Sequence, residues 1–243
     1  MAVRKGAAKM REAGVNPVGD AEASADKPGA GFESMCSPGG TSEANPRAGL
    51  RGPCALLMID MQMGFIDPAS PLCIAGAAAT IDACADVLAA ARAAGMRVFH
   101  VRREYAADGS DVEPVRHGLW LSGGRPLCRE GDFPNSLDAP ASLQAMPGEA
   151  VVVKPRFSAF FDTGLHETLQ EAGVETLVLI GTTTPNCIRT TCYDALSYNY
   201  NVIVVEDATS SRTPQVQQAN IADMAFIGAT VVDSRTFAGL AAS

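Results

Sequence analysis

The sequence lacks the features that would assign it to a membrane protein or to a nucleic-acid-binding protein. It has no uninterrupted apolar run that approaches the roughly 18 residues of a membrane-spanning helix. Its 19 Lys and Arg residues are outnumbered by 27 Asp and Glu residues, and no basic cluster could cover the phosphates of a nucleic acid. We therefore expect neither a membrane nor a nucleic acid among its partners.

The cysteines are too irregularly placed for a disulfide scaffold. Their number, seven, is odd, and no two of them form a C-x-x-C pair. The amino end also lacks the apolar segment of a secretory signal peptide. Reduced thiols are typical of a cytoplasmic protein, which is the location we expect. What the chain does have, 47% hydrophobic and 19% charged residues, is the composition of a globular protein.

Residues 1–50 differ in composition from the rest of the chain. They are rich in Gly, Ala, Pro, Ser and Glu and have almost no β-branched or aromatic residues to form a core. We expect a disordered extension, because such a segment buries too little apolar surface to offset the entropy lost on ordering. Four basic residues among the first eleven leave organelle targeting open as an alternative. Residues 51–243 are expected to form a single domain.

Six short apolar runs rich in β-branched residues alternate with helical patterns along this domain. The runs cover residues 55–59, 96–101, 150–153, 176–180, 202–205 and 230–232, and the helical patterns cover 75–94, 164–172, 188–198, 214–227 and a short segment from Ser234. The alternation predicts an α/β fold, a doubly wound three-layer sandwich with a six-stranded, mainly parallel sheet. Residues 105–148 have little periodicity and are interpreted as a long lid or binding loop.

One turn of this pattern contains a cysteine at the junction of a strand and a helix. The run 176–180 ends at Gly181, and Cys187 follows just before the helical pattern 188–198. The positive end of the helix dipole would lower the pKa of a thiol there and favour the thiolate. Taken by itself, the same cysteine could equally be a small buried hydrophobic residue.

Two other strand ends carry charged side chains. Asp60 follows the run 55–59, and Lys154 follows the run 150–153. Alone, the aspartate would be interpreted as a turn residue and the lysine as a solvated edge. A carboxylate, an ammonium and a thiol that each follow the carboxyl end of a parallel strand would converge on one cleft, and their joint occurrence favours an active site. Arg102 and Arg103, at a further strand end, could form an anion clamp or be solvated.

In order and context, these residues resemble the isochorismatase-like cysteine hydrolases. Asp60, Lys154 and Cys187 occur in LLMIDMQ, VVVKPRFSAF and LIGTTTPNCIRTTCYDA, and the resemblance extends from about residue 54 to the carboxyl end. The family includes nicotinamidases, N-carbamoylsarcosine amidohydrolases, biuret hydrolases and ureidoacrylate amidohydrolases. The resemblance implies a Cys–Asp–Lys triad, a cis peptide bond between Thr182 and Thr183, and an oxyanion hole at this turn.

The resemblance further implies hydrolysis of a C–N bond in a small amide or ureido compound through a thioacyl-enzyme, by a homo-oligomer without a cofactor. The histidines do not form the Asp-x-His pattern of the metal-binding nicotinamidases, so we expect no metal and a linear, ureido-type substrate. Vinyl-ether hydrolysis and a non-catalytic, metabolite-binding relative remain alternatives. The expected substrate contacts are Phe65, Trp120, Phe160, Phe161 and Asn186.

Overall fold

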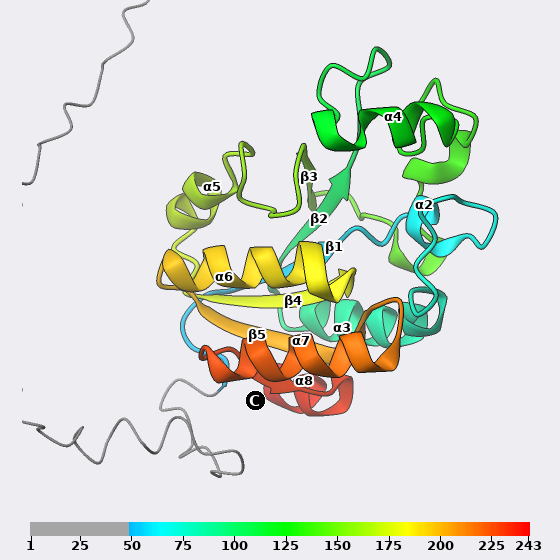
Figure 1. The fold of residues 1–243 in the computed structure, drawn as a ribbon. Helices are drawn as coiled ribbons and strands as arrows, with labels where there is room; N and C mark the ends of the chain where they lie inside the picture. Colours follow the sequence, from blue (N-terminus) through cyan, green and yellow to red (C-terminus); the bar gives the residue numbers. More distant parts are fainter. Residues whose placement is uncertain (1–48) are drawn as a thin grey trace, which may run out of the picture. The chain divides into compact units, whose positions relative to one another are not determined.

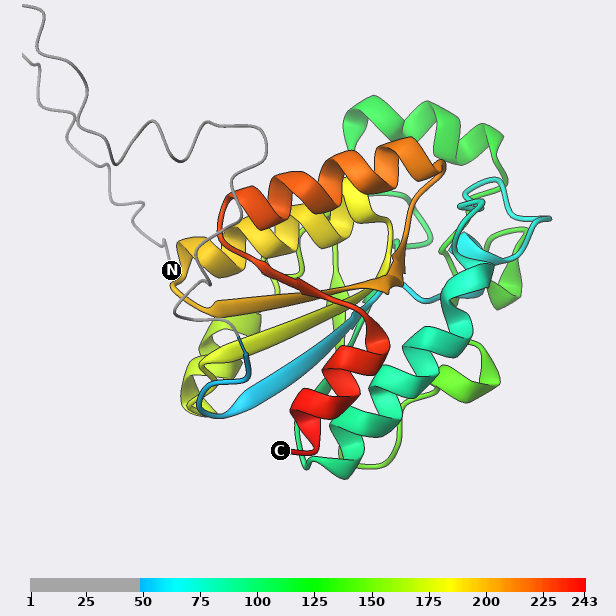
Figure 2. The same cartoon turned by 90° about the horizontal axis from the view of Figure 1, so that it is seen from below.

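The computed structural model describes residues 49–243, and nearly all of the extension expected at residues 1–50 lies outside this range. The described residues form a six-stranded, all-parallel sheet with the strand order β3-β2-β1-β4-β5-β6. Helices cover both faces of the sheet (Figures 1 and 2). The predicted doubly wound α/β fold is confirmed, and every neighbouring pair of strands is parallel.

Five strands match the apolar runs of the sequence within two residues at each end, whereas the fifth strand along the chain extends to Ser210, five residues beyond the predicted run 202–205. The strands are β1 (Cys54–Ile59), β2 (Arg97–Arg103), β3 (Ala150–Lys154), β4 (Thr176–Thr182), β5 (Asn201–Ser210) and β6 (Thr230–Val232). The central strand β4 is buried at every position, because helices pack on both of its faces. Such burial explains why its sequence is continuously apolar instead of alternating.

Two groups of helices sandwich the sheet. On one face lie α5 (Leu165–Glu171), α6 (Arg189–Ser197) and α7 (Pro214–Phe226), and on the other lie α3 (Ile81–Ala93) and α8 (Ser234–Ala241). Alternate residues of β1 serve the two cores: Leu57 and Ile59 face the α6 side, whereas Leu56 and Met58 face the α3 side. The period-two alternation of side chains therefore builds both layers from one strand.

The segment 105–148 is more regular than the sequence predicts. It contains the helix α4 (Pro114–Ser122) and the 3₁₀ turns η2 (Pro134–Leu137) and η3 (Ala141–Leu143), so a long structureless loop is wrong. The pattern was missed because α4 buries only Trp120 and exposes apolar residues such as Leu119. Within residues 49–243, no helix combines the length and the apolar character needed to cross a lipid bilayer.

One helix boundary differs from its prediction, and the structure defines two further local features. The helix expected at 75–94 begins at Ile81, after the short 3₁₀ turn η1 (Ala78–Thr80). The helix α5 is preceded by Gly164 in a left-handed conformation, and the Thr163 hydroxyl accepts from the N–H of Leu165, the first residue of the helix, at 3.3 Å. The segment after β1 contains a short helix, α2 (Met63–Ile66).

The topology of the sheet reverses at its centre. The chain first adds strands on one side of β1 and then returns to add β4 on its other side, so the strand order reverses between these two neighbours. Connections diverge there, and the carboxyl ends of the strands leave room for a ligand. Asp60 follows β1, and the turn with Cys187 follows β4.

Candidate active site

The structure brings together the three side chains that the sequence singles out. The Lys154 Nζ atom lies 2.8 Å from Asp60 Oδ2 and 3.4 Å from Cys187 Sγ. Asp60 and Lys154 are fully buried, and Cys187 is only 4% exposed. The cation therefore touches both the carboxylate and the thiol in a site that is closed to bulk water.

Asp60 leaves β1 in an unusual backbone conformation. Its φ is +54°, in the left-handed region that costs an L-residue about 1–2 kcal/mol. Its backbone N–H donates to the Val101 carbonyl on β2 at 2.8 Å, which anchors the turn to the neighbouring strand. Asp60 Oδ1 accepts no hydrogen bond of normal geometry from the described part of the chain. The carboxylate thus keeps acceptor capacity for a proton or a water molecule.

Lys154 occupies the end of the edge strand β3, where a lysine is usually solvated. Here Nζ also donates to the Arg156 carbonyl at 3.1 Å, in addition to its contacts with Asp60 and Cys187. An ammonium has three donors, and these three partners match that number. A buried charge of this kind is tolerated because it is paired and hydrogen-bonded.

A close approach of backbones positions the turn that carries Cys187. Gly181 pairs with Ile59 of β1 and has a φ of +114°, and a Cβ atom at this position would lie 2.0 Å from the Ile59 carbonyl oxygen. The peptide bond between Thr182 and Thr183 is cis. A single π-helical turn, η4 (Thr184–Ile188), then leads directly into α6. Only glycine fits at the point where β4 passes β1.

The electrostatics of Cys187 differ from the prediction. Burial raises the pKa of the Cys187 thiol to about 12, and the Asp60 carboxylate adds to the rise. Lys154 and Arg103 act in the opposite direction and lower the pKa, but they do not outweigh desolvation. This shift is opposite to the one expected from the helix dipole: burial favours the protonated thiol, and Asp60 is the adjacent group that can accept its proton.

The other predicted site residues lie in varied surroundings. Trp120 belongs to a small core cluster in the segment 105–148, where its Nε1 donates to the Pro126 carbonyl at 3.0 Å, and Phe65 packs against this cluster. Phe160 is buried in the main core and Phe161 is exposed. Asn186 is exposed beside Cys187. Substrate contacts for these five residues remain predictions, and the packing of Trp120 and Phe160 gives them an ordinary structural role.

Three residues near the site were missed or left open by the sequence. Arg103 was as compatible with a solvated strand end as with a clamp, yet it is 2% exposed and pairs in register with Lys154. Its position at the end of an apolar run was the available signal. Gln62 and Glu113, which hold Arg103, had no signal in the sequence because their contacts are tertiary.

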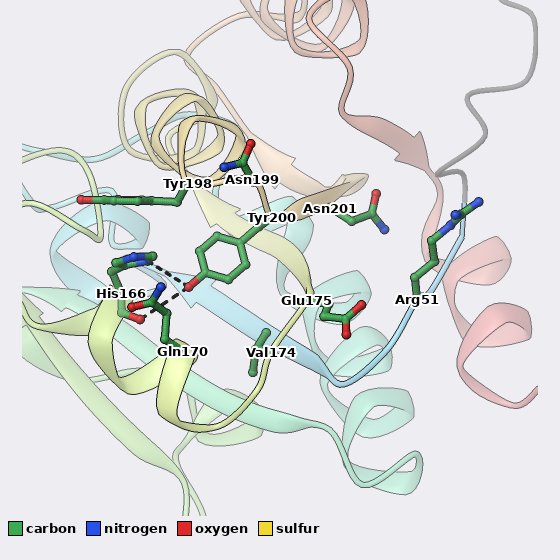
Figure 3. Close-up of a pocket in the computed structure, with 9 residues that line it drawn as sticks. All are labelled: Arg51, His166, Gln170, Val174, Glu175, Tyr198, Asn199, Tyr200 and Asn201. Carbon is green, nitrogen blue, oxygen red and sulfur yellow. Dashed lines mark hydrogen bonds between the residues drawn. The ribbon is translucent and has the colours of Figure 1, made fainter.

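A spacious groove lies elsewhere, at the amino ends of β4 and β5 (Figure 3). It has a volume of about 430 Å³. Its lining includes His166, Tyr198 and Tyr200, and the Tyr200 hydroxyl lies 3.0 Å from His166 Nδ1. Asp60, Lys154 and Cys187 are at the carboxyl ends of the strands and do not line this groove. The groove therefore lies at the end of the sheet opposite to the candidate active site.

The described residues also bear on the question of a metal. Among residues 49–243, no three His, Cys, Asp or Glu side chains gather in a group suited to hold a metal ion. A metal-free and cofactor-free site remains a prediction from the sequence.

A family model and several curated proteins match the chain. The model of the isochorismatase domain covers residues 54–236. A protein of Arabidopsis thaliana named as a probable inactive nicotinamidase is 39% identical, over 72% of this chain and 89% of that protein. Maleamate amidohydrolase of Pseudomonas putida is 35% identical, over 70% of this chain and 78% of that enzyme. Ureidoacrylate amidohydrolase of Azorhizobium caulinodans is 33% identical, over 74% and 88%, respectively.

Proposed function

Because the chain belongs to the isochorismatase family, we propose that it is a cysteine-dependent amidohydrolase that cleaves a C–N bond in a small amide or ureido compound. The observation that carries this proposal is the contact of one buried ammonium, Lys154, with both the Asp60 carboxylate and the Cys187 thiol. A thiol beside a base and a cation is the arrangement that nucleophilic catalysis requires. The likeness to the maleamate and ureidoacrylate amidohydrolases supports the reaction class.

The first half of the reaction forms a thioester. Asp60 takes the proton of the Cys187 thiol as Sγ attacks the carbonyl carbon, which matches a resting thiol whose pKa is about 12. Lys154 stabilises the negative charge as it passes from Asp60 to sulfur, because it contacts both groups. Asp60 then gives the proton to the leaving nitrogen, and the C–N bond breaks with release of ammonia or a small amine.

The second half regenerates the thiol. A water molecule gives a proton to Asp60 as its oxygen attacks the thioester carbonyl, and the C–S bond breaks. The acid leaves, and the proton returns from Asp60 to Cys187. We assign the developing oxyanion in both halves to the backbone N–H groups of Thr183 and Cys187, with Thr182 as the preceding residue of the turn. One such donor typically contributes about 3–4 kcal/mol.

An ammonia-release screen tests the proposal. Ureido compounds, carbamoyl amino acids and simple amides would be incubated with the wild type, Cys187→Ala and Cys192→Ala. Cys192 is a matched control, because it is a buried cysteine of α6 outside the catalytic contacts. The expected result is turnover by the wild type and Cys192→Ala, and loss in Cys187→Ala. If Cys187→Ala retains more than about a tenth of the wild-type activity, the variant raises the activation free energy by less than about 1.4 kcal/mol, and covalent catalysis is contradicted. Vinyl-ether hydrolysis, with Asp60 as the acid catalyst, would then become the favoured function.

One comparison favours a second candidate, a metabolite-binding relative without catalysis. The similar protein of Arabidopsis thaliana is named as probably inactive. Against this candidate, Asp60, Lys154 and Cys187 are all present and in contact here. If no compound of the panel releases ammonia but one raises the melting temperature, the binding function is favoured.

We also propose that the chain forms a homo-oligomer. Val115 and Leu119 are exposed one turn apart on α4, and Val151 and Val153 are about half exposed on the edge strand β3. Exposed apolar patches often mark protein interfaces. Light scattering is expected to give a multiple of the 25.2 kDa chain mass, and a single chain's mass at micromolar concentration rejects the proposal. A cytoplasmic location remains a prediction from the cysteine pattern.

A further inference from the structure

Arg103 is a buried arginine at the same edge of the sheet as the catalytic side chains. It is the last residue of β2 and pairs in register with Lys154, the last residue of β3. Its side chain is only 3% exposed. Arginine is among the residues least often buried, so its place beside the site needs an explanation beyond the fold.

The backbone of Arg103 is fixed by a glutamine from the β1 turn. Gln62 Nε2 donates to the Arg103 carbonyl at 2.9 Å, and the Arg103 N–H donates to Gln62 Oε1 at 2.8 Å. The backbone pairing of β1 with β2 ends at Ile59 and Val101, and these two side-chain hydrogen bonds continue it to Arg103. Gln62, two residues after Asp60, thereby locks the arginine at a set position relative to the catalytic carboxylate.

The guanidinium group is held equally firmly. Nη2 donates to Glu113, and the Tyr105 hydroxyl donates to the same carboxylate at 2.9 Å. The guanidinium carbon lies 5.1 Å from the centre of the Tyr105 ring and 5.0 Å from that of Phe157, so two aromatic rings flank it. This arrangement orients a planar donor group before any ligand binds.

The Nε atom of Arg103 is the buried nitrogen of this group that lacks a hydrogen-bond partner in the part of the chain that the structure describes, whereas Nη2 also lies 3.4 Å from the Pro155 carbonyl. An unmade hydrogen bond of a buried donor costs about 1–3 kcal/mol, so an acceptor is expected at this position when the site is in use. The group is also close to the nucleophile: the charge of Arg103 lowers the pKa of Cys187, against the stronger effect of burial.

We propose that Arg103 is a specificity-determining residue, whose Nε donates to a second oxygen atom of the substrate, beside the amide that Cys187 attacks. This inference rests on the proposed function and names its substrate class: a compound with one oxygen on the scissile carbonyl and another acceptor oxygen nearby. A neutral carbonyl or ureido oxygen and a carboxylate share this chemistry. Glu113 already balances the charge of Arg103, and its charge therefore influences whether a neutral oxygen or a carboxylate of the substrate is preferred.

Protection of Cys187 from iodoacetamide tests the inference without requiring turnover. The probes are malonamide, malonamate and propionamide, which present a second neutral oxygen, a carboxylate and no second oxygen, respectively. In the wild type, malonamide or malonamate should protect Cys187 at a concentration at least tenfold below that of propionamide. Cys187→Ala defines the labelling of the other cysteines. Equal protection by all three probes overturns the inference.

The variants are chosen to separate recognition from folding. Arg103→Lys keeps the charge but loses Nε, and it should abolish the tenfold preference. Arg102→Lys is the matched control: Arg102 Nε is likewise buried without a hydrogen-bond partner among the described residues, but the Arg102 side chain is partly exposed and pairs with Glu104, and this variant should keep the preference. If Arg103→Lys does not fold, Glu113→Gln decides, because removal of the counter-charge should shift protection toward malonamate. A preference unchanged in Arg103→Lys, or in Glu113→Gln when only that variant folds, overturns the proposal.

A failure of the inference about Arg103 can be distinguished from a failure of the proposed amidohydrolase function. Ammonia release reports hydrolysis, whereas protection reports binding, and the two are measured on the same samples. Loss of the preference in Arg103→Lys with no ammonia from any probe supports Arg103 as a binding residue and leaves hydrolysis to the wider screen. Ammonia release with a preference that Arg103→Lys does not change keeps the amidohydrolase and rejects the role of Arg103.

Discussion

Single residues in this site are arranged so that burial, and not the helix dipole, sets the state of the nucleophile. Cys187 precedes α6, where the dipole favours a thiolate, but the thiol is almost entirely removed from water. The cost of a desolvated anion exceeds the help from Lys154, and the pKa of Cys187 rises to about 12. In the proposed mechanism the thiol proton is therefore transferred during the attack, and Asp60 is the group that takes it.

This protonation state predicts the pH dependence of alkylation. Because a thiol with a pKa of about 12 is mostly protonated below that pH, the thiolate fraction and the iodoacetamide rate at Cys187 should rise about tenfold per pH unit from pH 7 to 9. Mass spectrometry of the Cys187 peptide measures the rate. Lys154→Gln should slow it at every pH, since the nearest cation is lost. A plateau below pH 8 would show that the thiolate is already formed.

Among the elements, β4 and its turn depend on one close backbone contact. Gly181 lies against Ile59 with a φ of +114°, and Gly228, before β6, has nearly the same φ of +113°, but no atom of residues 49–243 other than its own neighbours would lie within 4 Å of a Cβ added there. The two glycines therefore share the conformational requirement and differ in space. Gly181 pairs with Ile59 of β1, and β4 ends one residue later, at Thr182, where the turn that carries Cys187 follows.

Gly181→Ala should therefore destabilise the protein much more than Gly228→Ala. The strained φ alone costs about 1–3 kcal/mol at either position, and at Gly181 a clash of 2.0 Å with the Ile59 carbonyl adds to it. Urea unfolding of both variants measures the difference. Equal losses would mean that β4 can move away from β1 at little cost.

A second contact between elements, the ion pairs of Glu149 with α3 and β2, depends on pH. Glu149, next to β3, accepts from Arg92 of α3 at 2.7 Å and lies 2.7 Å from His100 Nε2 of β2. Chiefly because of the Arg92 hydrogen bonds, the pKa of Glu149 falls from 4.5 to about 2. A lowered carboxyl pKa stabilises the fold above the unfolded-state value and loses that contribution as the pH falls through the folded-state value.

Glu149→Gln should therefore lower the urea midpoint at pH 7. The difference from the wild type should shrink between about pH 4.5 and pH 2, where Glu149 becomes protonated in both states. Glu171→Gln, an exposed position of α5, serves as the control and should show little effect at either pH. A constant difference at all pH values would show that the charge of Glu149 is not what stabilises the contact.

At the scale of the whole molecule, the family match begins at residue 54, but the described contacts begin earlier. Asn201 Nδ2 donates to the Gly49 carbonyl at 2.9 Å, and the Thr176 hydroxyl donates to the Arg51 carbonyl at 2.7 Å. Residues 49–51 thus hold the amino ends of β4 and β5. A truncation that removes residues 1–48 keeps these contacts.

We predict that deletion of residues 1–48 leaves the melting temperature and the turnover nearly unchanged, since those residues include few core-forming side chains. Deletion of residues 1–52 should lower stability, because each lost hydrogen bond contributes about 0.5–1.5 kcal/mol. Thermal unfolding of the two truncations measures the effect. A large loss in the shorter deletion would show that the extension contributes to the domain.

The sequence by itself determined where the strands lie, which reactive side chains follow them, and the family to which the chain belongs. Asp60, Lys154 and Cys187 could be recognised because buried parallel strands are continuously apolar, and a polar residue marks where the chain leaves the sheet. The helix α4 escaped prediction because it buries only Trp120 and leaves apolar residues such as Leu119 exposed, so its apolar residues do not mark a face packed on the core.

Only the tertiary structure decided how these residues behave. The protonation of Cys187 depends on desolvation and on charges brought from β1, β2 and β3, and the burial of Arg103 depends on Gln62 and Glu113, which are distant from it in the chain. Local sequence determines hydrogen-bonding and apolar patterns along a strand. Electrostatic energies depend on the distances between strands and on excluded water, and these exist only once the sheet has assembled.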